Sequence, residues 1–150
     1  MTKPVLAIAI STLFLAAASP ALANTAGCAK ADEAAAKAMF DKWATALPGH
    51  NEDLMLDFYT RDASFKPHDT DAALTERTQI RGWWHEFVNK TPTVELGSST
   101  VTSDCNSFVK SGVKTIKAGD ETITANFVME YANQDGVWLI KRHELTPVTN

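Results

Sequence analysis

The segment from Thr122 to Thr146 reads TITANFVMEYANQDGVWLIKRHELT, and it determines more of the expected fold than any other part of the chain. Apolar and polar residues alternate on both sides of Asn133-Gln134-Asp135-Gly136, which predicts a long β-hairpin. Side chains alternate between the two faces of a strand, so this pairing places Arg142 and Glu144 on the apolar face. The other residues expected there are Ala125, Phe127, Met129, Tyr131, Trp138 and Ile140. An apolar face that carries two opposite charges at one end indicates either the rim of a pocket or a structural ion pair.

Period-two alternation begins after Pro92 and continues through the rest of the chain. Short turns between neighbouring strands predict an antiparallel meander. The expected strands are 94–102, 106–117, 121–131 and 137–146, preceded by a brief strand over 62–66.

The loop at Ala118-Gly119-Asp120 fixes which face of the preceding strand is buried. A three-residue loop with glycine in the left-handed conformation sets Val109, Ser111, Val113 and Thr115 beside the apolar face. A two-residue turn would instead point Lys110 and Lys114 inward. We therefore expect the three-residue loop.

Three helices are expected before the meander. Met39, Phe40, Trp43 and Leu47 recur at helical spacing within 29–47, which ends at Pro48-Gly49. Asn51 caps a short helix through Tyr59 with Leu54, Met55 and Phe58 inward, and a third helix covers 76–89 after Thr75. It buries Ile80, Trp83 or Trp84, Phe87 and Val88. Helices followed by strands predict an α+β fold, with a curved antiparallel sheet of four to six strands and the helices on one face.

The first 23 residues have the pattern of a signal peptide. A positively charged start, an apolar run from Val5 to Ala18 and the small residues Ala21-Leu22-Ala23 predict cleavage after Ala23. The apolar run is shorter than the roughly 20 residues that span a bilayer. We therefore expect a single domain over residues 24–150, periplasmic or secreted, without a membrane span.

Charge and cysteine usage limit the function classes. The chain has net charge −4, which becomes about −5 without the leader. No stripe of Lys and Arg is interleaved with aromatic residues, so no nucleic-acid partner is expected. Export favours a disulfide between Cys28 and Cys105 over a redox role. An alternative is lipid modification of Cys28, although Thr25 stands where an aliphatic residue is usual.

Three segments carry a resemblance to a known family. They are Phe58-Tyr59-Thr60-Arg61-Asp62-Ala63, Ile80-Arg81-Gly82-Trp83-Trp84 and Asp135-Gly136-Val137-Trp138-Leu139-Ile140. In this order the chain resembles the nuclear transport factor 2-like superfamily, especially the association domain of calcium/calmodulin-dependent kinase II and its bacterial relatives. The resemblance implies a sheet wrapped around a long helix, a conical cavity, and homodimers or larger assemblies through sheet faces. Members bind peptides or small molecules, act as assembly hubs, or catalyse cofactor-free isomerisation, cyclisation and dehydration.

The chain departs from its relatives at the end of the last strand. Relatives often carry two or three adjacent histidines there, whereas this chain has Lys141-Arg142-His143-Glu144. By strict alternation His143 lies on the face opposite Arg142. The aspartate and tyrosine pair of steroid isomerase relatives has no match, so no catalytic role is carried over.

Seven residues are candidates for lining the cavity. Arg142 could bind a carboxylate, with Glu144 beside it, or both could form a structural ion pair. Arg81 could point to the cavity mouth or lie on the surface, and His68 could act as an acid or base in a lid. The aromatic candidates are Tyr59, Trp84 and Tyr131, with Trp43 and Phe65 as further lining or plain core.

The residues leave two functions open. One is binding of a small, partly apolar molecule, or assembly through an outer sheet face that carries Val128, Leu139 and Leu145. The other is acid–base catalysis in the same cavity. The dispersed histidines and the lack of a glycine-rich loop predict neither a metal site nor a cofactor.

Overall fold

The computed structural model describes residues 27–148, so the predicted signal peptide lies outside the described residues. Within 27–148 the chain forms helices followed by a sheet, as predicted. The elements are α1 (Glu33–Ala46), the 3-10 turn η1 (Leu47–Gly49), α2 (Glu52–Leu56), β1 (Tyr59–Lys66), α3 (Arg77–Val88), β2 (Thr93–Asp104), β3 (Ser107–Ala118), β4 (Glu121–Gln134) and β5 (Val137–Pro147). No helix in this part of the chain is long and apolar enough to cross a membrane.

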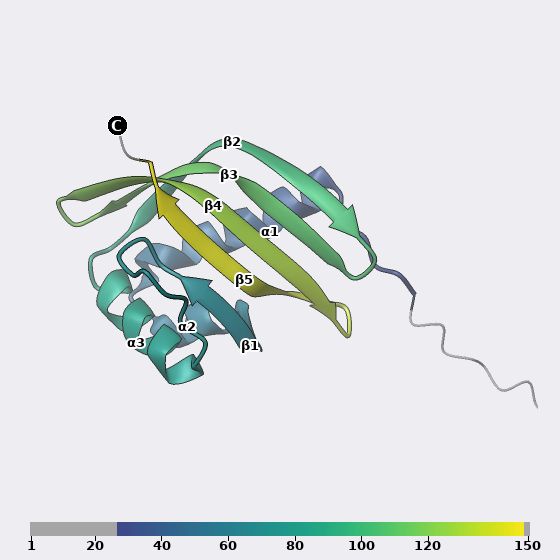
Figure 1. The fold of residues 1–150 in the computed structure, drawn as a ribbon, viewed down its shortest axis with the longest axis horizontal. Coiled ribbons are helices and arrows are strands. Elements are labelled where there is room, and N and C mark those ends of the chain that lie inside the picture. The colour runs from purple at the N-terminus through teal and green to yellow at the C-terminus, as the bar shows by residue number, and fades with distance from the viewer. Residues whose placement is uncertain (1–26, 149–150) are drawn as a thin grey trace, which may run out of the picture.

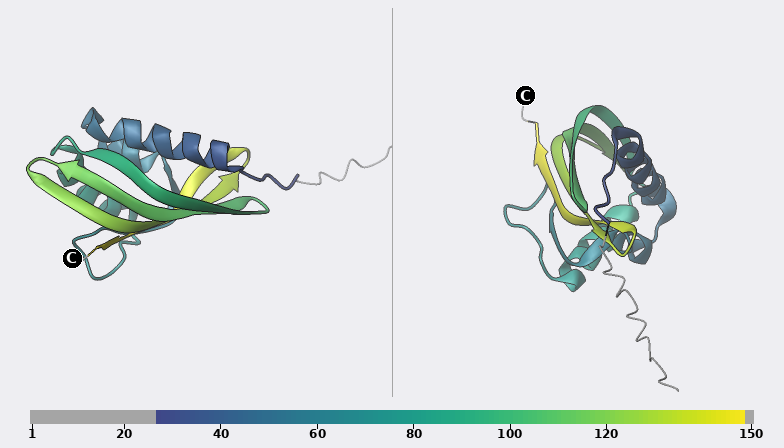
Figure 2. Two further views of the ribbon diagram at one scale, coloured as in Figure 1. Left: turned by 90° about the horizontal axis from the view of Figure 1, so that it is seen from above. Right: turned by 90° about the vertical axis from the view of Figure 1, so that its right-hand side faces the viewer.

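The sheet has five strands in the order β1-β5-β4-β3-β2 (Figure 1). Strands β2 to β5 form the predicted antiparallel meander. Strand β1 joins its edge parallel to β5, so the sheet is mixed rather than purely antiparallel. The predicted α+β fold is confirmed, and the sheet curves around α1 (Figure 2).

Helix α1 lies over the concave face of the sheet (Figure 2), and its buried side chains belong to the hydrophobic core. Phe40, Trp43 and Leu47 of the predicted stripe are buried, as is Ala36, whereas Met39 is only partly buried. The helix begins at Glu33 rather than at Ala29, because the Asp32 side chain accepts a hydrogen bond from the Ala35 amide and caps it.

Helices α2 and α3 lie together at one end of the sheet, beside β1 (Figure 1). Asn51 caps α2 as predicted by accepting from the amide of Leu54. The inward placement of Leu54 is wrong, because this short helix turns it outward and leaves it 41% exposed. Helix α3 buries Trp84, and Trp83 is only partly buried.

The expected three-residue loop between β3 and β4 is wrong. Ala118 pairs with Glu121, which leaves the two-residue turn Gly119-Asp120 with Gly119 at φ +60°. This register places Lys110 opposite Met129 and Lys114 opposite Ala125, on the concave face. Both lysine side chains are buried. The space between α1 and the concave face of the sheet, called the cone interior, can accommodate these lysines because it supplies hydrogen-bond partners and aromatic faces.

A bulge in β5 reverses the expected orientation of its last residues. Tyr131 pairs with Ile140 but Glu130 pairs with Arg142, so Lys141 is an extra residue. The expectation that Arg142 and Glu144 share the apolar face is therefore wrong: they lie on the outer face. The bulge turns His143 inward, opposite Met129, where it is fully buried. It also turns Leu145 inward, although the sequence predicted it on the outer face.

Cys28 and Cys105 form a disulfide, as expected from the sequence. It joins the segment before α1 to the β2–β3 turn, with the two Cα atoms 4.9 Å apart. The Ala29 amide also donates to the side chain of Asn106, which fixes this segment to the same turn.

Candidate functional site

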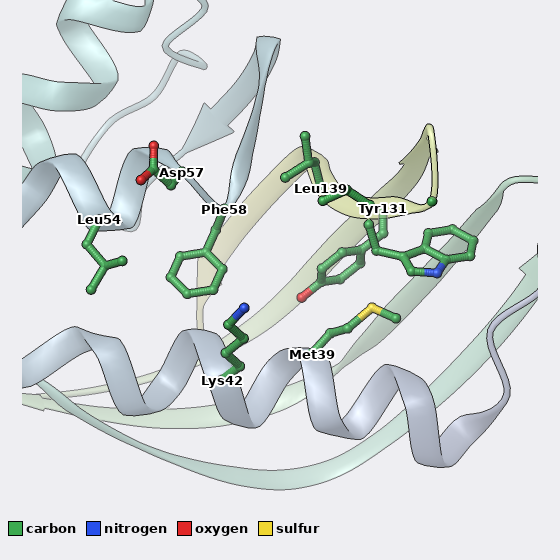
Figure 3. A pocket seen from close by; sticks show the side chains of 10 residues that line it. Met39, Lys42, Leu54, Asp57, Phe58, Tyr131 and Leu139 are labelled. Atoms are coloured by element: carbon green, nitrogen blue, oxygen red, sulfur yellow. The ribbon is translucent and has the colours of Figure 1, made fainter.

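A pocket of about 500 Å³ opens between α1, the α2–β1 junction and the β4–β5 hairpin (Figure 3). Its volume falls within the roughly 300–1,000 Å³ of small-molecule sites. Most of its wall is apolar. The lining residues are Met39, Lys42, Leu54, Asp57, Phe58, Tyr131, Gly136, Val137, Trp138 and Leu139.

Three polar side chains stand among these apolar residues. Lys42 extends from α1 into the space, the Tyr131 hydroxyl points into it from β4, and Asp57 lies at the far side beyond Phe58 (Figure 3). Burial raises the pKa of Tyr131, so its hydroxyl stays protonated at neutral pH. The pocket therefore offers an amine, a carboxylate and a hydroxyl to a mainly apolar molecule.

A chain of three hydrogen-bonded side chains lies deeper in the cone. The Tyr59 hydroxyl lies 2.7 Å from Nδ1 of His143, and Nε2 of the same ring lies 3.1 Å from Nζ of Lys114. All three side chains are buried, His143 and Lys114 completely. The chain joins β1, β5 and β3 across the inside of the sheet.

Aromatic rings surround the amine end of this chain. Nζ of Lys114 lies 4.4 Å from the ring centre of Trp43, 5.0 Å from that of Phe127 and 5.8 Å from that of Phe40. The His143 ring packs edge-on against Trp43 with centroids 5.5 Å apart. Ring faces attract cations, so this cage partly replaces the water that Lys114 lost on burial.

Burial shifts the pKa of Lys114, His143 and Tyr59 in the direction that favours the neutral form of each group. It lowers the pKa of Lys114 to about 7, and burial together with the Lys114 charge lowers the pKa of His143 well below its usual value. Burial raises the pKa of Tyr59. With a neutral amine, two arrangements satisfy both contacts: Tyr59 donates to Nδ1 while Nε2–H donates to Nζ, or Nζ donates to Nε2 while Nδ1–H donates to the Tyr59 oxygen. Protonation of Lys114 leaves only the second arrangement, because an ammonium group can only donate.

Two indole groups near Tyr59 lack hydrogen-bond partners. The Nε1 atoms of Trp43 and Trp84 are buried and unpaired. Both indole N–H groups nevertheless lower the pKa of Tyr59, because they favour its ionised form. This effect is smaller than the rise in pKa caused by burial. The Tyr59 end of the chain thus has more donors than acceptors.

Lys110 is the second inward lysine and has its own partner. Its Nζ donates to the Ser99 hydroxyl at 3.0 Å and lies 5.9 Å from the ring centre of Phe40. Burial lowers the pKa of Lys110. Two amines therefore stand on the concave face of β3.

The structure divides the predicted site residues among different places. Tyr59 and Trp84 lie in the cone interior, and Tyr131 lines the pocket. Arg142 lies outside, where it donates to Glu130 and to Glu144, each at 3.1 Å. Both carboxylates raise the pKa of Arg142. These contacts are those of the structural ion pair that the sequence left open.

Arg81 and His68 lie outside both the pocket and the interior chain. Arg81 is half exposed on α3 and forms ion pairs with Asp53 at 2.8 Å and Glu52 at 3.0 Å. His68 follows β1 and lies 6.1 Å, centroid to centroid, from the Trp83 ring. Its Nε2 is 3.9 Å from a Glu121 carboxylate oxygen.

Sequence reasoning missed Lys114 and His143 as interior residues. The available signal was the two-residue turn that would point the lysines inward, together with the apolar Leu145 two residues after His143. Inward placement of both His143 and Leu145 requires the bulge at Lys141, which strict alternation does not reveal.

The fold defines the class of protein. The chain has the nuclear transport factor 2-like fold, also called cystatin-like, and the resemblance predicted from the sequence is confirmed. A structure from Xanthomonas campestris, provisionally named a calcium/calmodulin-dependent kinase II association domain, is 28% identical. It matches over 77% of this chain and 86% of its own, with a TM-score of 0.73.

Two further structures share the fold at low identity. A nuclear transport factor 2-like protein of unknown function from Pseudomonas putida is 13% identical, with a TM-score of 0.68 over 79% of this chain and 87% of its own. A protein from Streptomyces avermitilis, provisionally named a dehydratase, is 11% identical, with a TM-score of 0.65 over 77% and 94%. No protein-family profile matches the chain, and no curated protein is significantly similar to it in sequence.

Proposed function

We propose that this protein binds a small, mainly apolar molecule in the pocket between α1 and the β4–β5 hairpin. The observation that carries the proposal is a cavity of about 500 Å³ whose apolar wall holds three polar side chains. Apolar surface supplies affinity and a few placed polar groups supply orientation. Lys42, exposed at the rim, favours a ligand with a negative group over a neutral one.

Two fluorescent probes with the same aromatic body test this proposal. N-phenyl-1-naphthylamine is neutral, and 8-anilino-1-naphthalenesulfonate adds a sulfonate. We expect both to bind, and Lys42→Met to weaken the sulfonate probe about two- to five-fold while leaving the neutral probe unchanged.

A matched pair of variants locates the binding. Met39→Trp fills the pocket and should abolish binding of both probes, whereas Ala38→Trp adds the same indole on the exposed side of α1 and should not. Equal binding by the two variants would contradict the pocket proposal.

Assembly is the second part of the proposed function. The Xanthomonas structure named as an association domain supports a homodimer through the outer sheet face, which carries Val128, Glu130 and Arg142. Native mass spectrometry tests it directly. A monomer at micromolar concentration would contradict the homodimer.

A second candidate function is cofactor-independent acid–base catalysis. The hydrogen-bonded chain of Tyr59, His143 and Lys114 favours it, because three titratable groups in contact can move a proton without an external cofactor. Turnover of a carbonyl substrate that is lost in Tyr59→Phe would support catalysis, and binding without turnover would leave the binding function.

We also propose a periplasmic or secreted location after cleavage of residues 1–23. The disulfide between Cys28 and Cys105 is compatible with an oxidising compartment. Intact-mass measurement of the exported protein separates cleavage after Ala23 with a disulfide from lipid attachment at Cys28.

A further inference from the structure

Lys114 stands in the arrangement that activates a nucleophile. Its Nζ contacts Nε2 of His143, and Nδ1 of the same ring is held by the Tyr59 hydroxyl. A nucleophile in contact with a base, which is itself oriented by a third group, is the pattern common to enzymes that use covalent catalysis. We propose that Lys114 captures a small, uncharged aldehyde or ketone as an imine inside the cone.

The surroundings of Lys114 suit the product as well as the amine. Trp43, Phe127 and Phe40 present their rings to Nζ within 5.8 Å. A protonated imine carries its charge on the same nitrogen as the ammonium group, so the same rings stabilise it. Aromatic walls also favour an uncharged carbonyl compound over a carboxylate-bearing one.

The charged and titratable neighbours are consistent with a neutral amine. His143 contacts Nζ from β5, Tyr59 lies behind it on β1, and Lys110 stands four residues earlier on β3. Among residues 27–148, no carboxylate forms a hydrogen bond or ion pair with Lys114 or His143. Burial lowers the pKa of Lys114 to about 7, which leaves a large neutral fraction at neutral pH.

The proposed reaction balances without an oxidant or reductant. The neutral amine of Lys114 forms a C–N bond to the carbonyl carbon, while the π bond of the carbonyl breaks. One proton passes from the nitrogen through His143 to the oxygen, which gives a carbinolamine. The hydroxyl then leaves with the second proton of the nitrogen as water, and a C=N bond forms. The Tyr59 oxygen accepts the Nδ1 hydrogen of His143, which leaves Nε2 free to take the proton from the nitrogen.

Entry to Lys114 rests on the proposed pocket. Lys114 is fully buried, but the pocket reaches Phe58 and Tyr131, and Phe58 directly precedes Tyr59. Tyr59 and Tyr131 both pair with Ile140, from its two sides. The pocket and the interior chain therefore meet around Ile140, and Met39 and Phe58, which line the pocket, are only partly buried.

Reductive trapping of the folded protein tests the proposal. The purified protein is incubated with acetaldehyde and sodium cyanoborohydride at neutral pH, and ethylated lysines are mapped by peptide mass spectrometry. The exposed Lys117 on the same strand and Lys90 after α3 are internal controls in the same molecule. We expect Lys114 to be modified about ten-fold faster than either control.

Two variants separate an activated lysine from an accidentally reachable one. His143→Gln and Tyr59→Phe should each slow modification of Lys114 about ten-fold and leave Lys117 unchanged. An unmodified Lys114 beside modified Lys117 and Lys90 would overturn the proposal. The proposal would also be overturned if the rate of Lys114 modification rose in parallel with global unfolding in urea. This measurement uses the wild-type protein, so it does not depend on whether the variants fold.

Failure of the imine proposal can be distinguished from failure of the proposed binding function. If the naphthylamine probe binds and Lys114 is not trapped, the pocket function stands and the imine proposal fails. If Lys114 is trapped and neither probe binds, the pocket admits acetaldehyde but does not bind larger apolar molecules, so the imine proposal stands and the binding function fails.

Discussion

The buried amine of Lys114 makes a quantitative prediction about stability and pH. Its pKa falls from 10.5 to about 7 on folding, because burial disfavours the ammonium form. Between these values the unfolded chain binds a proton that the folded chain does not. Stability therefore rises as pH increases through this range, by up to about 1.4 kcal/mol per pH unit. Integrated from about pH 7 to pH 10, the contribution of Lys114 is roughly 3 to 4 kcal/mol.

The assay compares the wild-type protein with Lys114→Met in urea or guanidinium unfolding under non-reducing conditions. Methionine keeps the length of the side chain and removes its titration. We expect the stability of the variant relative to the wild type to decrease by roughly 3 to 4 kcal/mol as pH is raised from about 7 to 10. The buried Tyr59 and Tyr131 titrate in both proteins, so their effects largely cancel.

A matched control is available on the same strand. Lys117 is exposed three residues further along β3, and Lys117→Met should track the wild type at every pH. If Lys114→Met also ran parallel to the wild type, the amine would be charged in the folded protein, and the argument from burial would be refuted.

His143, Gly112 and Arg142 each allow a further test, with Gly82 on α3 as a control for Gly112. Burial lowers the pKa of His143, so acid should destabilise the wild type below about pH 6.5, by at most about 1.4 kcal/mol per pH unit, and His143→Gln should flatten this dependence in unfolding curves. A Cβ on Gly112 would come 2.1 Å from the Ser98 carbonyl oxygen, so Gly112→Ala should lower the free energy of unfolding by about 1–3 kcal/mol. Gly82→Ala, where nothing lies within 4 Å, should instead raise it by about 0.5–1 kcal/mol, and the same sign for both would contradict the packing argument. Arg142→Met should cost less than about 1 kcal/mol, because its ion pairs are substantially solvent-exposed, and should leave both naphthyl probes bound; loss of probe binding would return Arg142 to the site.

The sequence predicted the architecture because alternation and turn residues are local signals. The β4–β5 hairpin follows from Asp135-Gly136 and from the alternation on either side, and it is confirmed up to Ile140. Beyond that residue the prediction fails, because a bulge adds one residue without changing composition. Every side chain after Lys141 is then on the opposite face from the one expected.

The interior chemistry could not be predicted for a second reason. Lysine is assigned to the surface when its charge is taken as fixed, and this assumption selected the wrong loop before β4. Burial of Lys114 requires a hydrogen-bond partner and aromatic faces, which come from His143, Trp43 and Phe127 on distant segments. These contacts exist only after the sheet has closed around α1.

The β3–β4 turn and the β5 bulge, which the sequence did not predict, together form the contact between Lys114 and His143. The two-residue turn brings Lys114 inward on β3, and the bulge brings His143 inward on β5; either change alone would leave one of them without its partner in the cone. A buried amine or imidazole without a hydrogen-bond partner destabilises the fold. The two-residue turn and the bulge are therefore each favourable only when the other is present. Deletion of Lys141 removes the bulge but leaves Arg142 opposite Glu130 and His143 opposite Met129, so the contact between His143 and Lys114 should survive and the fold should lose less stability than in His143→Gln. A deletion of Lys141 that unfolds more easily than His143→Gln would show that the bulge itself, and not only the pairing of His143 with Met129, maintains the fold.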